Sequence, residues 1–358
     1  MTTPASSISL KFITIVSMTV LFFSSKVNAE SYEAFGNYTL GSARAIGIGG
    51  AYTSISDDSN AFFYNPAGVA ISDVELQFVA DFNRLNNDEH YIDPNASGEA
   101  VSSQFALIGG HYKKGPLSLG LGYLMPYFVE LQNELLLTRF RSLQIREVGA
   151  NASYAVDDHW AVGLNAKYSE AIQIEKTDSV TRDMQSNISY IQLGVLYKTE
   201  RWSTGYSFSP ELRWAATSTA SSTFLDVTSP QKHVLGASYF IEPKKIRVAM
   251  DLVYIKKIKD VIAYESNFNL FQESLKDPDY LFPKFGIEFV LIESEKTTAQ
   301  FRLGFYEEPS RVTSSLTRRH LSVGFEIRYG PASLQIAQDQ ADGFTNTSQA
   351  ISVVVDKF

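Results

Sequence analysis

The sequence predicts an all-β protein, a transmembrane antiparallel β-barrel of about fourteen strands with an N-terminal hatch segment in its lumen. Three observations predict this fold. An apolar run near the N-terminus is typical of an exported protein. From Val74 onward, apolar and polar residues alternate with a period of two, and short connections between the alternating segments alternate with long ones.

The first element is an export signal. Residues 12–23 form an apolar run that follows Lys11 and precedes Val27-Asn28-Ala29. A membrane-spanning helix needs roughly 20 apolar residues, and this run is shorter. We therefore expect residues 1–29 to be a signal peptide that is cleaved between Ala29 and Glu30. Any membrane residence of the mature chain would then be in β-strands.

The second element is a segment without alternation, residues 30–71, which is rich in Gly, Ala, Ser and Asp. Small residues let two backbones approach closely inside a crowded lumen, and Pro66 restricts Asn65 to extended conformations. We predict that this segment is a lumenal hatch or plug. Its acidic pair, Asp57-Asp58, fits hydrogen bonding to backbone amides or lumenal arginines, and equally fits an Asx turn with solvated carboxylates.

The third element is the barrel, predicted at residues 72–358. In residues 321–328, for example, Leu, Val, Phe and Ile alternate with Ser, Gly, Glu and Arg. Tight turns such as Glu242-Pro243 alternate with long loops such as 258–279, which is the pattern of an outer-membrane barrel with periplasmic turns and external loops. The expected strands are 72–83, 103–112, 116–125, 141–155, 158–172, 187–199, 201–213, 231–241, 244–257, 280–293, 297–307, 316–328, 331–339 and 348–358.

Alternation alone does not say which face points inward, since a secreted β-sandwich or propeller also alternates. The export signal, the unequal loops and the terminal aromatic Phe358 favour the membrane barrel. We therefore expect the lumen to hold charges of both signs. The expected lumenal charges are Glu75, Asp81, Lys167, Arg247, Asp251, Glu288, Arg302 and Arg328.

The last strand ends at Phe358, and outer-membrane barrels commonly end in an aromatic residue that the barrel assembly machinery reads. Ile351, Val353 and Val355 are in phase with one another, but Phe358 has the opposite parity. A β-bulge near Asp356 would restore the phase.

Composition excludes several functions. The chain has 358 residues, a formal net charge of -8 and no cysteine. An acidic chain does not suit nucleic acid, and the absence of cysteine excludes disulfides, thiolate metal sites and a lipidated cysteine. The sequence contains neither a His-Glu-x-x-His nor a Gly-x-Ser-x-Gly motif. We predict neither an enzyme nor a cofactor or metal site.

Residues 41–68 contain Arg44, Gly49-Gly50-Ala51, Asp57-Asp58 and Asn65-Pro66-Ala67-Gly68. This stretch resembles the opening of the FadL family of outer-membrane transporters, which includes channels for long-chain fatty acids and aromatic hydrocarbons. The resemblance implies a fourteen-stranded barrel blocked by an N-terminal hatch. It assigns the hatch and gating role to Asn65, Pro66, Ala67, Gly68, Arg44 and Asp58. The same stretch also resembles PorV-like relatives, which serve protein secretion.

The first functional hypothesis is passive uptake of hydrophobic small molecules such as long-chain fatty acids across the bacterial outer membrane, with both termini periplasmic. Clustered apolar residues in the long loops would capture the ligand; these are Leu135, Leu136, Leu137, Phe268 and Phe271. The alternative is a PorV-like barrel that binds secretion or envelope proteins. A general porin fits less well, because a hatch would obstruct its pore.

Overall fold

The computed structural model describes residues 41–87, 101–133, 139–176, 181–215, 227–256, 279–308, 318–341 and 346–357. Several residues singled out from the sequence lie outside these ranges. They are the cleavage residues Ala29 and Glu30, the capture residues Leu135, Leu136, Leu137, Phe268 and Phe271, and the terminal Phe358.

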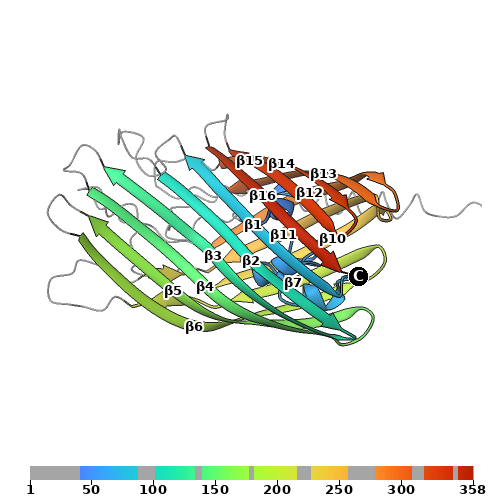
Figure 1. The fold of residues 1–358 in the computed structure, drawn as a ribbon, viewed down its shortest axis with the longest axis horizontal. Helices are drawn as coiled ribbons and strands as arrows, with labels where there is room; N and C mark the ends of the chain where they lie inside the picture. The colour runs from blue at the N-terminus through green and yellow to red at the C-terminus, as the bar shows by residue number, and fades with distance from the viewer. Residues whose placement is uncertain are drawn as a thin grey trace, which may run out of the picture.

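Within the described residues, fourteen strands close into one antiparallel barrel, in which β1 completes the ring by pairing with β16. The predicted all-β, fourteen-stranded antiparallel barrel is confirmed. The end of the barrel with the tight turns, at the right of Figure 1 beside the C-terminus, is the turn rim, and the opposite end is the loop rim. The wall strands are β1 (Leu76–Asn87), β2 (Val101–Lys114), β3 (Leu117–Asn133), β4 (Arg139–Ala155), β5 (Trp160–Lys176), β6 (Thr181–Lys198), β7 (Trp202–Ser209), β10 (Lys232–Glu242), β11 (Ile246–Ile255), β12 (Tyr280–Glu293), β13 (Thr297–Glu308), β14 (Arg318–Tyr329), β15 (Ala332–Ala341) and β16 (Asn346–Lys357).

The strand expected at 201–213 is divided, which corrects the sequence prediction. β7 ends at Ser209, and β8 (Leu212–Trp214) pairs with β9 (Val227–Ser229) in a separate two-stranded sheet. Pro210 has no backbone N–H and cannot continue the ladder, so the chain leaves the wall at this point. β3 and β4 also extend into the loop expected at 126–140.

The two faces of the wall have opposite chemistry. In β16, Ile351, Val353 and Val355 are exposed, whereas Ser352 and Asp356 are buried. The same division runs around the barrel, with Leu121 70% exposed on the outside and Arg302 fully buried inside. A wall that turns its large apolar side chains outward suits lipid, so these strands form a transmembrane barrel.

Aromatic side chains gather at the turn rim. The Tyr197 ring lies 4.8 Å from that of Trp160 and 5.0 Å from that of Trp202, measured between centroids. Aromatic rings at this position are typical of a membrane–water interface.

Residues 41–72, called the lumenal segment below, lie inside the barrel, where Figure 1 shows their helical turns in blue among the strands. The segment contains α2 (Ala43–Gly47), η1 (Ser59–Phe62) and η2 (Gly68–Ile71). α2 contacts β13 to β16 and η2 contacts β2 to β6, so the segment touches the wall on both sides of the lumen. No helix among the described residues is long and apolar enough to cross a bilayer.

Two details of the expected lumen change. Glu75 precedes β1 and is exposed, so it is not a lumenal charge. No bulge occurs at Asp356, because the pairing of β1 with β16 is regular up to Leu76 and Lys357. Asp356 instead accepts a hydrogen bond from Gln77 and forms an ion pair with Arg328 in the lumen.

Candidate functional site

The lumenal segment fits the wall with direct backbone contact. A Cβ atom added at Gly304 would lie 1.9 Å from the backbone nitrogen of Gly49, and one at Gly163 would lie 2.4 Å from the backbone of Pro66. Real Cβ atoms do not approach other atoms so closely. Glycine is therefore required at these wall positions, because the backbone of the lumenal segment lies directly against them.

Polar side chains of the wall satisfy the backbone of the segment. Asp251 Oδ2 accepts hydrogen bonds from the amides of Tyr52 and Thr53 at 3.1 and 3.0 Å. Asn165 and Gln192 donate from their amide nitrogens to carbonyl oxygens of the segment at 3.2 and 3.1 Å. Buried backbone groups need such partners, so these side chains fix the segment in place.

The sequence Asn65-Pro66-Ala67-Gly68 forms a tight turn at the wall. Asn65 Nδ2 donates to the carbonyl oxygens of Thr53 and Val195 at 2.9 and 3.1 Å, and its Oδ1 accepts from the Ala67 amide at 3.1 Å. Ala67 is completely buried, and a Cβ at Gly68 would lie 1.8 Å from the carbonyl oxygen of Ser56. These four residues lie together, and none of them lines the first cavity described below.

Arg44 and Asp58 come together in a charged cluster with Asp57. Arg44 Nη1 lies 2.6 Å from Asp57 Oδ1 and 3.2 Å from Asp58 Oδ2, and its Nε lies 3.5 Å from Glu288 on the wall. The Tyr52 hydroxyl donates to Asp58 Oδ2 at 2.5 Å. A lumenal arginine therefore binds the acidic pair, as the first of the two interpretations expects. The Asx turn of the second interpretation is also present, since Asp58 Oδ1 accepts from the Asn60 amide at 2.9 Å, but Asp58 is buried and not solvated.

The two aspartates have opposite electrostatic environments. Burial by itself raises the pKa of Asp57, but the positive charges of Arg44 and Arg247 outweigh it and lower the pKa. Burial dominates for Asp58 and raises its pKa, assisted by the negative charge of Asp57. Asp57 is therefore the ionised partner of Arg44 over the wider pH range.

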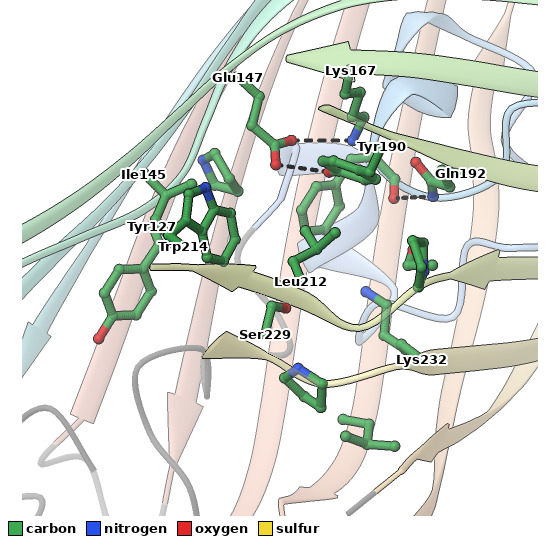
Figure 2. A pocket seen from close by; sticks show the side chains of 16 residues that line it. Tyr127, Ile145, Glu147, Lys167, Tyr190, Gln192, Leu212, Trp214, Ser229 and Lys232 are labelled. Atoms are coloured by element: carbon green, nitrogen blue, oxygen red, sulfur yellow. Dashed lines mark hydrogen bonds and ion pairs between the residues drawn. The ribbon is translucent and has the colours of Figure 1, made fainter. Parts of the chain in front are cut away.

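A cavity of about 130 Å³ lies on the loop-rim side of the lumenal segment. Figure 2 shows Leu212 and Trp214 of β8 facing Tyr127 and Ile145 of the wall. These side chains belong to a buried apolar cluster, and Trp214 is only 1% exposed. The cavity is therefore apolar on one side.

The other side of this cavity is charged. Lys167 Nζ lies 3.2 Å from Glu147, which also accepts a hydrogen bond from the Tyr190 hydroxyl at 2.7 Å. Lys232 Nζ lies 5.4 Å from the centre of the Phe63 ring. Among the described residues, no carboxylate forms an ion pair with Lys232, so its ammonium group is available to a ligand in the cavity.

A second cavity, of about 260 Å³, lies on the turn-rim side of the lumenal segment. Its lining is mostly polar and includes Arg44, Asp57, Asp58, Arg328 and Asp356. The lumenal segment thus separates the first cavity, which has an apolar side and is lined in part by Phe63, from a second cavity whose lining is mostly polar and charged.

The wall is irregular beside the first cavity. β3 contains one extra residue between Leu124 and Tyr127 relative to β4, and its pairing with β2 also shifts there. Pro126, which has no backbone N–H, lies in this bulge and lines the cavity.

Sequence reasoning missed the cavity residues Trp214 and Lys232. The prolines at 210 and 230, which flank β8 and β9, were the available signal that the chain leaves the wall there. Lys167 was expected in the lumen, but its partner Glu147 was not identified.

No protein-family model matches the chain, and no curated protein matches it. Solved structures do match. A FadL homologue of Pseudomonas aeruginosa is 10% identical with a TM-score of 0.59, over 88% of this chain and 98% of that one. The toluene transporter TbuX of Ralstonia pickettii is 14% identical with a TM-score of 0.60, over 92% and 99%. The CymD monoaromatic hydrocarbon channel is 12% identical with a TM-score of 0.60, over 90% and 98%.

Proposed function

We propose that this chain, which has the fold of FadL-like transporters, is a channel in the bacterial outer membrane for the passive uptake of hydrophobic small molecules. The observation that carries the proposal is the cavity behind β8 and β9, because a buried apolar cluster lines open space inside the barrel there. A channel for polar solutes has no need of such a cluster.

Long-chain fatty acids are the ligands that the lining of this cavity suits best. Their acyl chain would contact Tyr127, Ile145 and Trp214, and their carboxylate would bind the ammonium group of Lys232. A charge-assisted hydrogen bond of this kind is stronger than one between neutral groups.

The lumenal segment acts as a hatch in this proposal. Because its backbone is packed on wall glycines and bound by wall side chains, gating is a small local movement and not expulsion of the segment. Asn65, Pro66, Ala67 and Gly68 form the turn that holds the hatch to the wall, and Arg44 with Asp58 holds its turn-rim side. An apolar ligand would then leave sideways at the β3 bulge, since the cavity beyond the hatch is charged.

Export and capture complete the proposal. The signal peptide is removed between Ala29 and Glu30, and assembly machinery reads the last strand with Phe358. Leu135, Leu136, Leu137, Phe268 and Phe271 collect ligand outside the cell.

Uptake of labelled oleate tests the proposal in cells that lack this protein and its close relatives. We expect the wild-type gene to restore uptake. Lys232→Met should lower oleate uptake by about tenfold, because a hydrogen bond to a charged group contributes roughly 1.5–3 kcal/mol. Uptake of toluene, which has no carboxylate, should be unchanged.

Lys296→Met, in an exposed turn at the turn rim, is the matched control and should behave as wild type. Equal oleate uptake with and without the protein would contradict the channel function. Wild-type oleate uptake by Lys232→Met would contradict only the carboxylate-binding role of Lys232.

A further inference from the structure

The barrel wall has a step between β6 and β7. β6 pairs with β5 from Thr181 to Tyr197, but it pairs with β7 only from Leu193 to Lys198. β7 ends at Ser209, where the chain turns into the lumen. No other described wall strand pairs with residues 181–192, so this part of β6 is an open strand edge.

The end of the step nearer the turn rim coincides with the edge of the apolar outer surface of β6. On the outward face of β6, Ile191 and Leu193 are 53% and 48% exposed. Closer to the loop rim, the exposed outward residues are the polar Gln185, Asn187 and Ser189. Apolar side chains of the wall lie in the hydrocarbon layer, so the base of the step is level with the outer boundary of that layer.

The β8–β9 hairpin covers the step from inside at Ile188 and Tyr190. Only three residues of each strand pair with one another, and neither strand belongs to the barrel sheet. β8 lies against β6, and Ile188 and Tyr190 of β6 pack on the cluster that holds Leu212 and Trp214. Figure 2 shows the hairpin beneath Tyr190 and beside the cavity.

We propose that this step is a side entrance through which an amphipathic molecule with an acyl chain passes from the outer leaflet into the cavity, and that the β8–β9 hairpin is the flap over it. The inference rests on the proposed uptake function. Apolar contacts and a hydrogen bond from Trp214 Nε1 to the carbonyl oxygen of Ser169 (3.4 Å) hold the flap to the wall. An acyl chain entering beneath the flap makes the same kind of apolar contact with Tyr190 and Ile188. These contacts of the acyl chain offset part of the free energy needed to displace the flap. The head group of the ligand remains level with the polar outward residues of β6.

The chain has no cysteine, so the flap can be fixed specifically. In the double variant Ile188→Cys with Leu212→Cys, a disulfide or a short bismaleimide ties β8 to β6. The control, Arg213→Cys with Thr228→Cys, joins directly paired residues and ties the hairpin only to itself. Heat-dependent gel mobility verifies that each barrel is folded.

Bridging the flap to β6 should lower the initial rate of oleate uptake by about tenfold, because the flap is then held closed over the entrance. Reduction of the disulfide should restore the rate. The bridged control should transport as the wild type does. Wild-type rates in the bridged Ile188/Leu212 variant would overturn the side entrance and leave the channel function intact. Absence of oleate uptake by the unbridged protein would overturn both.

A second measurement uses Leu212→Cys alone in lipid vesicles. It should react faster with a pyrene maleimide dissolved in the bilayer than with a charged maleimide in the water. Faster reaction with the charged reagent would mean that the flap opens to solvent, which would overturn the entrance from the leaflet.

Discussion

At the scale of single residues, contacts to the lumenal segment explain residue choices that alternation leaves open. Gly304, Gly286 and Gly163 occupy lumenal positions where a serine would satisfy the alternating pattern equally well. At each of them, a Cβ atom would come within 2.4 Å of the lumenal segment. The lumenal segment, which lies far earlier in the sequence than these glycines, requires glycine at these positions, and strand propensity does not.

Gly304→Ala should destabilise the barrel by about 1–3 kcal/mol, because the new methyl group forces the backbone of Gly49 away from the wall. Urea unfolding in lipid vesicles measures the change. Gly122→Ala is the matched control, since its Cβ would meet only the Phe62 ring at 3.5 Å, an ordinary contact. Equal stability of the two variants would contradict this close packing.

The charged cluster gives a pH-dependent prediction. At pH 7, Asp57→Asn should lower the unfolding midpoint more than Asp58→Asn, because Asp57 is the ionised partner of Arg44 while burial raises the pKa of Asp58. Asn at position 58 can still accept the hydrogen bond of the Asn60 amide through its Oδ1, and its Nδ2 can donate to the Tyr52 hydroxyl.

The pKa of Asp57 is lowered by folding, so its carboxylate stabilises the fold above its unfolded pKa, and this stabilisation is lost as the pH falls through the folded pKa. The effect of Asp57→Asn should therefore shrink as the pH is lowered below about 4, the ordinary pKa of Asp. Asp58 has a raised pKa, so its contribution has the opposite sign and declines as the pH rises through the folded value. A constant difference between the variants at every pH would contradict these assignments.

At the scale of elements, β3 carries one more residue than the strands that it pairs with, which makes a bulge in the wall. The extra residue lies between Leu124 and Tyr127, and both of these side chains are buried. Removing one residue between them would restore continuous pairing with β4 and preserve the inward direction of both, because side chains alternate along a strand.

Deletion of Pro126 should leave the barrel folded, with equal or higher resistance to urea, and should slow transfer of oleate into the membrane if the bulge is its exit. Fluorescence of a labelled fatty acid in vesicles measures the transfer. Met125→Ala, which changes a side chain in the bulge and keeps the extra residue, is the control. Normal transfer by the deletion variant would exclude the bulge as the exit.

At the scale of the whole molecule, the outward apolar surface determines how the barrel sits in lipid. Leu121 lies well inside the wall and is 70% exposed, whereas Leu117 is the first residue of the same strand at the turn rim. The cost of a charge on the lipid side depends on its depth.

Leu121→Arg should cost about 2–4 kcal/mol if it lies near the bilayer midplane, and Leu117→Arg about 0–1 kcal/mol, because a charge at the interface remains hydrated. Unfolding in vesicles of defined thickness compares the two. Similar costs for both variants would contradict this placement of the wall in the membrane.

The sequence by itself determined the barrel, the order of its strands and the identity of its two faces. Alternation and turn residues are local properties, so they are readable without knowledge of partners. The division of the 201–213 strand was one exception, because Pro210 marked a change of sheet that alternation does not encode. Glu75 was another, because it precedes β1 and is exposed.

Only the tertiary structure decided the site. Glu147, Lys167, Trp214 and Lys232 lie on different strands and meet because barrel closure and register bring them to one cavity. Arg44 and Asp58 were recognised from a local motif, but their wall partner Glu288 depends on how the lumenal segment lies in the barrel. Long-range packing of this kind leaves no periodic trace in the sequence, and for that reason the fold was predictable and the cavity was not.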